Sequence, residues 1–184
     1  MTDGDLGDAE DDGDDLARVS ALVREVPDFP EPGVVFRDIT PVLADGAAFT
    51  AVSVALAALV GDADLVVGVE ARGFLLGAAA ALTAGTGIVP VRKAGKLPRV
   101  AASRRYDLEY GTATLELPAD VVPPGSRVLV VDDVLATGGT AAAACDLVVA
   151  AGAEVVGFAT MIELTALNGR ARLGTVPVHA LLTY

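Results

Sequence analysis

Two adjacent carboxylates, Asp132 and Asp133, end an apolar run and precede a loop of small residues. The run, 128–131, reads Val-Leu-Val-Val, which is typical of a strand buried on both faces of a parallel sheet. A Thr-Gly-Gly-Thr stretch follows at 137–140, and an alanine-rich segment, 141–151, predicts a helix after it. Glycines let backbone N–H groups approach an anion, and a helix N-terminus carries partial positive charge. This order of elements predicts a phosphate site.

The two carboxylates specify what else this site would hold. Asp132 and Asp133 would repel a phosphate unless their oxygens interacted with other groups of the ligand. Ribose hydroxyls could donate hydrogen bonds to them, and a Mg²⁺ held by the ligand could offset their charge. We therefore predict a site for a sugar 5′-phosphate whose hydroxyls lie on Asp132 and Asp133. A Walker A loop is excluded because no Gly-Lys-Ser/Thr follows the glycines. The alternative is an ordinary strand–turn–helix connection with solvated acids.

A second anion site is predicted at the turn Glu70-Ala71-Arg72-Gly73. This turn follows a short apolar strand, 65–69, and precedes a predicted helix, so it too lies at a helix N-terminus. Arg72 would be a charged ligand for the anion. The alternative is that Arg72 is a surface residue paired with Glu70.

The lysines of the chain are concentrated in one place. Lys93 and Lys96 are its only two lysines, and they lie in a short loop with Arg92 and Arg99. Ammonium and guanidinium groups gathered in this way suit a diphosphate. The alternative is a solvated basic loop.

Strands and helices alternate along the chain, which predicts a parallel sheet with helices on both faces. We expect strands at 65–69, 88–91, 112–117, 128–131, 154–162 and 178–183, and helices at 16–25, 47–60, 73–84 and 141–151, with a short helix at 168–173. In such sheets ligands bind at the carboxyl ends of the strands. The acidic pair, the Arg72 turn and the basic loop all follow strand ends, so they should gather on one edge.

Two further segments are predicted to be irregular. Prolines bound 26–41, which would form a small N-terminal hood over a flat ligand, or a capping loop with Phe36 as ordinary core. The charged stretch 92–110 is long for a structureless loop and, with the strand 112–117, predicts a mobile flap over 92–117.

Length and charge limit the possible functions. The 184 residues fit one domain, here 15–184, behind a disordered acidic tail, 1–14. The formal net charge is −12, but eight of the 25 acids lie in 3–15, and the remaining 17 acids face 13 bases. The folded part is therefore only mildly acidic, which argues against nucleic-acid binding.

The apolar and cysteine content points to a cytoplasmic protein. No apolar stretch is long enough to cross a bilayer, so we expect no membrane association. Cys145 is the only cysteine, which precludes an internal disulfide and agrees with a reducing compartment. It lies in the alanine-rich helix, where a buried small hydrophobe is expected rather than a nucleophile.

These motifs resemble those of a known family. The acidic pair and Thr-Gly-Gly-Thr resemble the phosphoribosyl-diphosphate motif of the type I phosphoribosyltransferases. Four other stretches are similar to the members of that family that act on adenine: FPEPGVVFRDITP (29–41), VGVEARGFLLG (67–77), PVRKAGKLP (90–98) and YDLEYG (106–111). The resemblance covers nearly the whole chain outside the acidic tail.

The resemblance implies a fold and a reaction. The fold would be the α/β type I phosphoribosyltransferase fold, a mostly parallel central sheet flanked by helices, with a hood and a mobile flap. The reaction would be purine salvage, in which ribose 5-phosphate passes from 5-phosphoribosyl 1-diphosphate to adenine, giving AMP and diphosphate. Mg²⁺ would be the cofactor, held mainly by the diphosphate substrate rather than by direct protein ligands, and the enzyme would be a homodimer.

The resemblance also implies site residues. Those for the phosphoribosyl group are Asp132, Asp133, Ala136, Thr137, Gly138, Gly139 and Thr140. Those for the diphosphate are Glu70, Ala71, Arg72, Arg92, Lys93 and Lys96, with an unusual cis peptide commonly found in the Glu70 turn. Those for adenine are Val35, Phe36 and Arg37. The catalytic residues would be Asp132 and Asp133 with Glu109 and Tyr110 of the flap, where Glu109 either handles a proton on adenine or only positions the flap.

Two other functions compete with this one. A sister enzyme would act on a 6-oxopurine such as hypoxanthine, guanine or xanthine, but the stretch 29–41 argues against it. A non-catalytic regulator would use the same fold to sense phosphoribosyl diphosphate. It would need an added DNA-binding segment, and the N-terminal extension is short and acidic.

Overall fold

The structure is a computed structural model that describes residues 8–108 and 111–184, with side chains described for 15–106 and 111–184. The contacts within the chain form two compact units, 1–52 and 53–184. We had expected one domain over 15–184. The boundary falls inside the helix α3 (Gly46–Val60), so the predicted hood belongs to the first unit.

The first unit begins with α1 (Asp8–Leu22) and continues with β1 (Arg24–Pro27), β2 (Val35–Asp38) and α2 (Thr40–Ala44). The helix α1 starts within the segment predicted to be disordered, since residues 8–14 are helical; residues 1–7 of that prediction lie outside the described residues. An ion pair of 2.8 Å joins Arg18 of α1 to Asp45.

The hood is more regular than expected. β1 and β2 pair antiparallel, with Val26 opposite Phe36. The connection turns at Asp28 (φ +56°) and Gly33 (φ +90°), and the Gly33 N–H donates to the Asp28 carboxylate at 2.8 Å. Four-residue strands bounded by prolines carry no alternating pattern, and a proline excludes only a central strand, not a two-stranded edge pair.

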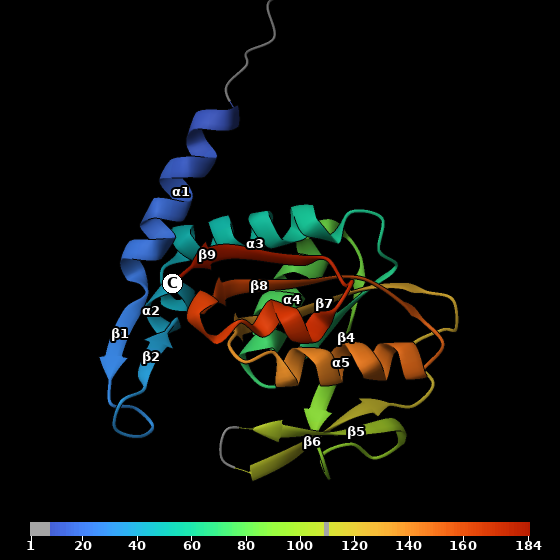
Figure 1. The fold of residues 1–184 in the computed structure, drawn as a ribbon. Coiled ribbons are helices and arrows are strands. Elements are labelled where there is room, and N and C mark those ends of the chain that lie inside the picture. Colours follow the sequence, from blue (N-terminus) through green and yellow to red (C-terminus); the bar gives the residue numbers. More distant parts are fainter. Residues whose placement is uncertain (1–7, 109–110) are drawn as a thin grey trace, which may run out of the picture. The chain divides into compact units, whose positions relative to one another are not determined.

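The second unit is built on a seven-stranded sheet (Figure 1) in the order β5-β6-β4-β3-β7-β8-β9. Five adjacent strands of this sheet run parallel to one another: β3 (Leu65–Val69), β4 (Gly87–Lys93), β7 (Arg127–Leu135), β8 (Glu154–Glu163) and β9 (Val178–Thr183). The mostly parallel sheet predicted from the sequence is thereby confirmed.

Helices cover both faces of this sheet, as predicted. Alternate residues of β7 point to opposite sides: Val128 and Val130 join the core cluster that contains the helix α5 (Gly139–Ala150). On the other side, Gly68 of β3 lies against the backbone of α4 (Arg72–Ala84). The predicted short helix near 168 is two 3₁₀ turns, η1 (Thr165–Leu167) and η2 (Gly169–Leu173).

The flap differs from the prediction of an irregular loop. β5 (Val100–Leu108) and β6 (Gly111–Pro118) form an antiparallel hairpin, and β6 pairs with β4. β5 is an edge strand that reads Val-Ala-Ala-Ser-Arg-Arg at its start, so it shows little of the apolar alternation by which strands are found in a sequence. Ala102 and Tyr106 nevertheless pack against the core, which fixes the hairpin as part of the sheet.

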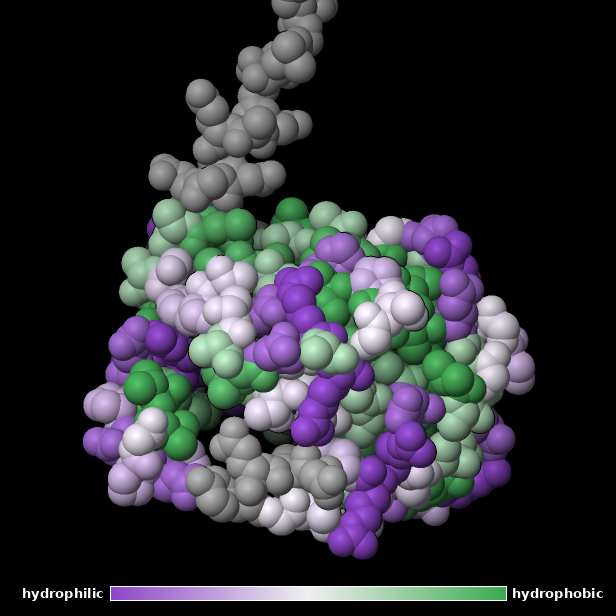
Figure 2. Space-filling model, in the orientation of Figure 1, coloured by the Kyte–Doolittle hydropathy of each residue, from purple (hydrophilic) through white to green (hydrophobic). Residues whose placement is uncertain are grey.

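Hydrophilic and hydrophobic residues are interspersed on the face drawn in Figure 2. Across the described residues, no helix combines the length and the apolar character that a membrane span needs.

Candidate functional site

The predicted phosphate-binding elements of the second unit share one edge of the sheet. β4, β3 and β7 are adjacent and parallel, and their carboxyl ends lead into the basic loop, the Glu70 turn and the acidic pair, respectively. The convergence expected from the sequence is therefore what the fold produces, because parallel strands end at the same edge.

The loop after β7 encloses a pocket of about 70 Å³. The pocket is lined by Asp132, Val134, Leu135, Ala136, Thr137, Gly138, Gly139, Thr140 and Ala141. Gly138 has φ +82°, a left-handed conformation that suits glycine, and α5 begins directly after it. The pocket thus combines a glycine turn with a helix N-terminus, which is the arrangement that binds a phosphate.

This loop rests on a second glycine that the sequence reasoning missed. A Cβ at Gly138 would collide with the carbonyl of Gly169, and a Cβ at Gly169 would collide with the carbonyl of Ala136. Gly169 starts η2, more than thirty residues away along the chain. No sequence motif marked Gly169, because its close contact with the backbone of residues 136 and 138 forms only when η2 packs against the loop after β7.

The two carboxylates are buried, with 7% of Asp132 and 6% of Asp133 exposed. Asp132 Oδ1 accepts the Asp133 backbone N–H at 2.8 Å. Burial, and next the charge of Asp133, raise the pKa of Asp132 well above its ordinary value. Buried carboxylates of this kind suit groups that donate hydrogen bonds or carry positive charge. That they bind ribose hydroxyls stays a prediction.

Arg72 lies beside this pair. Its Nε is 2.7 Å from Asp133 Oδ2, an ion contact whose angle does not meet the geometry of a directed hydrogen bond. This ion pair is thus with Asp133, whereas the alternative had paired Arg72 with Glu70. Gly73 permits this closeness, because a Cβ there would be 2.8 Å from the Val131 carbonyl oxygen and 2.9 Å from Asp132 Oδ1.

Glu70 organises the basic loop. Its carboxylate accepts the Lys93 backbone N–H at 2.9 Å, pairs with the Lys96 ammonium, and lies 3.4 Å from Arg92 Nε. Burial opposes ionisation of Glu70, but the hydrogen bonds from Lys96 and Lys93 and the nearby charges outweigh it and lower the pKa. Glu70 therefore faces the cations, and any part it has in diphosphate binding acts through them. The peptide Glu70–Ala71 is cis, as the resemblance implied.

The residues expected to bind adenine belong to the first unit. Val35, Phe36 and Arg37 lie on β2. The Phe36 ring packs edge-on against Phe29 with centroids 5.3 Å apart, and Arg37 pairs with Glu25 of β1. The structure thus gives Phe36 an aromatic partner and leaves Val35 46% exposed.

The flap residues Glu109 and Tyr110 lie outside the described residues, so their predicted roles stay predictions. The hairpin that carries them is linked to α5 by an ion pair of 2.6 Å between Arg104 and Asp146. No motif in the sequence assigned a role to Arg104.

Cys145 is confirmed as a structural residue. It is 6% exposed in α5, and burial raises the pKa of its thiol to about 12. A thiol that is almost never a thiolate is not a nucleophile.

Comparison with known proteins identifies the family. The phosphoribosyl transferase domain model matches residues 40–174. The adenine phosphoribosyltransferase of Saccharopolyspora erythraea is 62% identical, and the match covers 92% of each chain.

Two solved structures extend the likeness to the fold. The Thermoanaerobacter pseudethanolicus adenine phosphoribosyltransferase is 46% identical with a TM-score of 0.88, over 92% of this chain and 99% of that one. The Saccharomyces cerevisiae enzyme, complexed with adenine and an imino-altritol bisphosphate, is 36% identical with a TM-score of 0.86, over 92% and 99%. With its acidic pair, its glycine loop and these relatives over nearly its whole length, the chain belongs to the phosphoribosyl transferase family.

Proposed function

We propose that this protein transfers ribose 5-phosphate from 5-phosphoribosyl 1-diphosphate to adenine, giving AMP and diphosphate in purine salvage. The observation that carries the proposal is the buried pair Asp132 and Asp133, of which Asp132 lines the pocket of the glycine loop, in a chain 62% identical to an adenine phosphoribosyltransferase. The pocket suits the 5′-phosphate, and the carboxylates suit the sugar hydroxyls.

The reaction makes the sugar carbon cation-like as the diphosphate departs. The negative charge of Asp132 and Asp133 then lies near the developing positive charge and stabilises it. Backbone N–H groups of residues 136–140 hold the 5′-phosphate, so that the ribose cannot turn away from the incoming base.

The leaving diphosphate is stabilised by the basic loop. Arg92, Lys93 and Lys96 supply the charge, with Glu70 fixing their positions in the free enzyme. Arg72 would join them once ribose hydroxyls take over Asp133. Each of these contacts grows stronger as negative charge accumulates on the departing group, which favours the transition state over the substrate.

The site also fits Mg²⁺. Asp133 Oδ2 is a buried carboxylate oxygen that accepts no hydrogen bond, and hard oxygen donors are what Mg²⁺ prefers. Among the described residues no group of three or more His, Cys, Asp or Glu could hold a metal. In this proposal most of the Mg²⁺ ligands are oxygens of the diphosphate substrate. Bound there, Mg²⁺ would offset charge on the diphosphate.

The remaining assignments are made on the resemblance. Val35, Phe36 and Arg37 bind adenine, Glu109 and Tyr110 act from the flap, and flap closure excludes water that would hydrolyse the donor. The protein works as a homodimer in the cytoplasm, without nucleic acid or membrane.

The test is AMP formation from adenine and phosphoribosyl diphosphate with Mg²⁺, with hypoxanthine, guanine and xanthine assayed in parallel. We expect turnover with adenine alone. Preferred turnover of a 6-oxopurine would replace the adenine assignment with that of the sister enzyme. Tight donor binding without turnover of any base would instead identify a sensor.

A further inference from the structure

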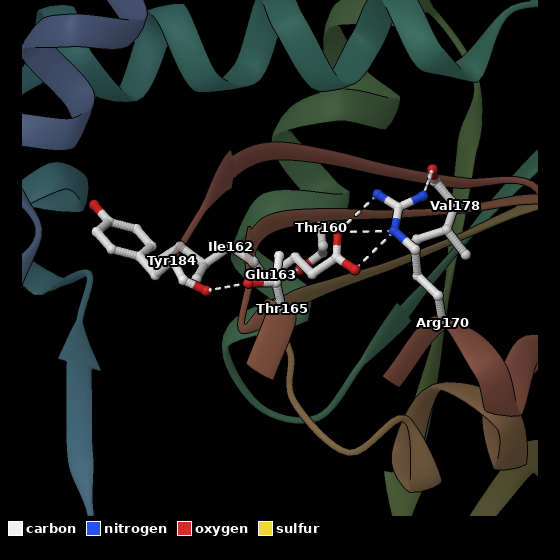
Figure 3. A network of polar contacts seen from close by, with 7 residues as sticks. All are labelled: Thr160, Ile162, Glu163, Thr165, Arg170, Val178 and Tyr184. Carbon is white, nitrogen blue, oxygen red and sulfur yellow. Dashed lines mark hydrogen bonds and ion pairs between the residues drawn. The ribbon is translucent and has the colours of Figure 1, made fainter. Parts of the chain in front are cut away.

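An ion pair between a buried carboxylate and an exposed arginine lies beside the phosphate pocket but outside the residues that line it. Glu163, the last residue of β8, has only 6% of its side chain exposed. Arg170 of η2 donates to both of its oxygens, from Nε at 2.7 and 2.9 Å and from Nη2 at 2.7 Å (Figure 3). Such a two-pronged contact fixes geometry more strictly than a single hydrogen bond does.

Arg170 also reaches a third element. Its Nη1 donates to the carbonyl of Val178, the first residue of β9, at 2.7 Å. The other end of β9 is tied to the same region, because the Tyr184 N–H donates to the Glu163 carbonyl and the Tyr184 carbonyl accepts from Thr165 (Figure 3). One side chain therefore holds η2 against both β8 and β9.

The phosphate loop is in direct contact with what this pair holds. Gly169, adjacent to Arg170, approaches Gly138 and the carbonyl of Ala136 so closely that neither glycine could carry a Cβ. On the strand side, Leu135 lies opposite Glu163 in the β7–β8 register, and the Leu164 N–H donates to the Leu135 carbonyl at 2.9 Å. The loop thus begins beside Glu163 and turns against Gly169.

We propose that Glu163 and Arg170 are positioning residues for the 5′-phosphate: their ion pair holds η2 in place, so that Gly169 supports the backbone of the loop 136–139 from behind. A phosphate is bound there by backbone N–H groups, whose directions depend on the path of the chain. Glycines have no side chains whose packing could fix that path, so contact with η2 has to fix it.

This inference rests on the proposed function of the loop, and it makes a selective prediction. In the full-length enzyme, Arg170→Met and Glu163→Gln should each raise KM for phosphoribosyl diphosphate about tenfold and leave KM for adenine within about twofold. Arg170→Lys keeps the charge but loses the two-pronged hydrogen bonding of the guanidinium. Its KM for phosphoribosyl diphosphate should therefore lie between those of the parent enzyme and Arg170→Met. The double variant should be no worse than the worse single one, because both changes remove the same contact.

The matched control is Arg172→Met, which removes another exposed arginine from the same short helix. It should leave both KM values unchanged. Calorimetric binding of AMP and adenosine adds a readout that a loss of stability alone does not move, because only AMP carries the 5′-phosphate. We expect Arg170→Met to weaken AMP about tenfold and to leave adenosine unchanged, at a temperature where every variant is folded.

Two results would overturn the inference. One is an unchanged KM for the donor in folded Arg170→Met and Glu163→Gln. The other is an equal loss of affinity for AMP and adenosine, which would make the pair a general stabilising contact. Thr137→Ala and Gly138→Ala separate this failure from failure of the site itself. If they also leave donor KM unchanged, the loop is not the phosphate site; if they raise it while Arg170→Met does not, only the role of the pair is wrong.

Discussion

Asp132 and Asp133 are neighbours in sequence but have different surroundings. Oδ2 of Asp133 is 2.7 Å from Nε of Arg72. Asp132 instead accepts a hydrogen bond from the Asp133 backbone N–H, and burial and the charge of Asp133 raise its pKa. Two buried like charges weaken a folded protein unless a ligand offsets them. The ligand-free protein therefore gives up stability at the predicted sugar site.

Asp133→Asn tests the functional side of this pair. The amide keeps the shape but loses the charge that would face the ribose and Mg²⁺, so we expect kcat to fall about 100-fold or more. Far-ultraviolet circular dichroism should match that of the parent protein. Turnover close to that of the parent would show that Asp133 has no role in the reaction.

Asp132→Asn tests the cost in stability. Because the folded pKa of Asp132 is raised, the folded state binds the proton more tightly than the unfolded state, so stability falls as pH rises from about 4 through the folded pKa. The asparagine variant lacks this loss and should be more stable at pH 7.5, by about 1 kcal/mol, while losing turnover. Thermal unfolding of both proteins at pH 4.5 and 7.5, without ligands, measures the difference. A stability gap that does not widen with pH would contradict the raised pKa.

At the scale of elements, the first turn of α4 has to lie almost in contact with the end of β7. The helix brings Arg72 to Asp133, and only a residue without a side chain fits at Gly73. The same rule shapes the phosphate loop, where Gly138 and Gly169 meet backbone to backbone. Both contacts join elements that are far apart in sequence.

Gly73→Ala should therefore damage the enzyme although alanine favours helices. The new Cβ would push the first turn of α4 away from the Val131 carbonyl and from Asp132, and we expect destabilisation by about 1–3 kcal/mol together with a large loss of kcat. Gly46→Ala is the control, since a Cβ there meets nothing within 4 Å and Gly46 is also at the start of a helix. Urea unfolding and steady-state assays of both variants would be compared; equal behaviour would mean that α4 has room to shift.

On the scale of the whole molecule, the acidic N-terminus dominates the net charge without belonging to the predicted site. Eight of the 25 acids lie in residues 3–15. We expect deletion of residues 1–14 to leave kcat and both KM values unchanged at low salt, because none of the predicted site residues lies in this segment. Steady-state assays at low ionic strength would check this. A large loss of activity would show that the N-terminus takes part in the active enzyme.

The sequence alone determined those parts of the molecule that depend on local pattern. The apolar runs placed β3 and β9 at the residues where they are found, and alanine-rich periodicity gave α3 and α5 to within two residues at each end. The glycine loop, the acidic pair and the basic loop were recognisable because their chemistry is contiguous along the chain. Their convergence on one edge followed from the rule that parallel strands end together.

The tertiary structure decided the rest, because it concerns contacts between distant residues. The short pair β1–β2 and the edge strand β5 leave little alternating pattern, so only pairing reveals them, whereas the alternation of 112–117 predicted β6. No local rule connects Arg72 with Asp133, Glu70 with Lys96, or Arg170 with Glu163. Gly169 is the clearest case. A glycine can occur in a sequence for many structural reasons, and only the close approach of the Gly169 backbone to residues 136 and 138 shows why a glycine is needed here.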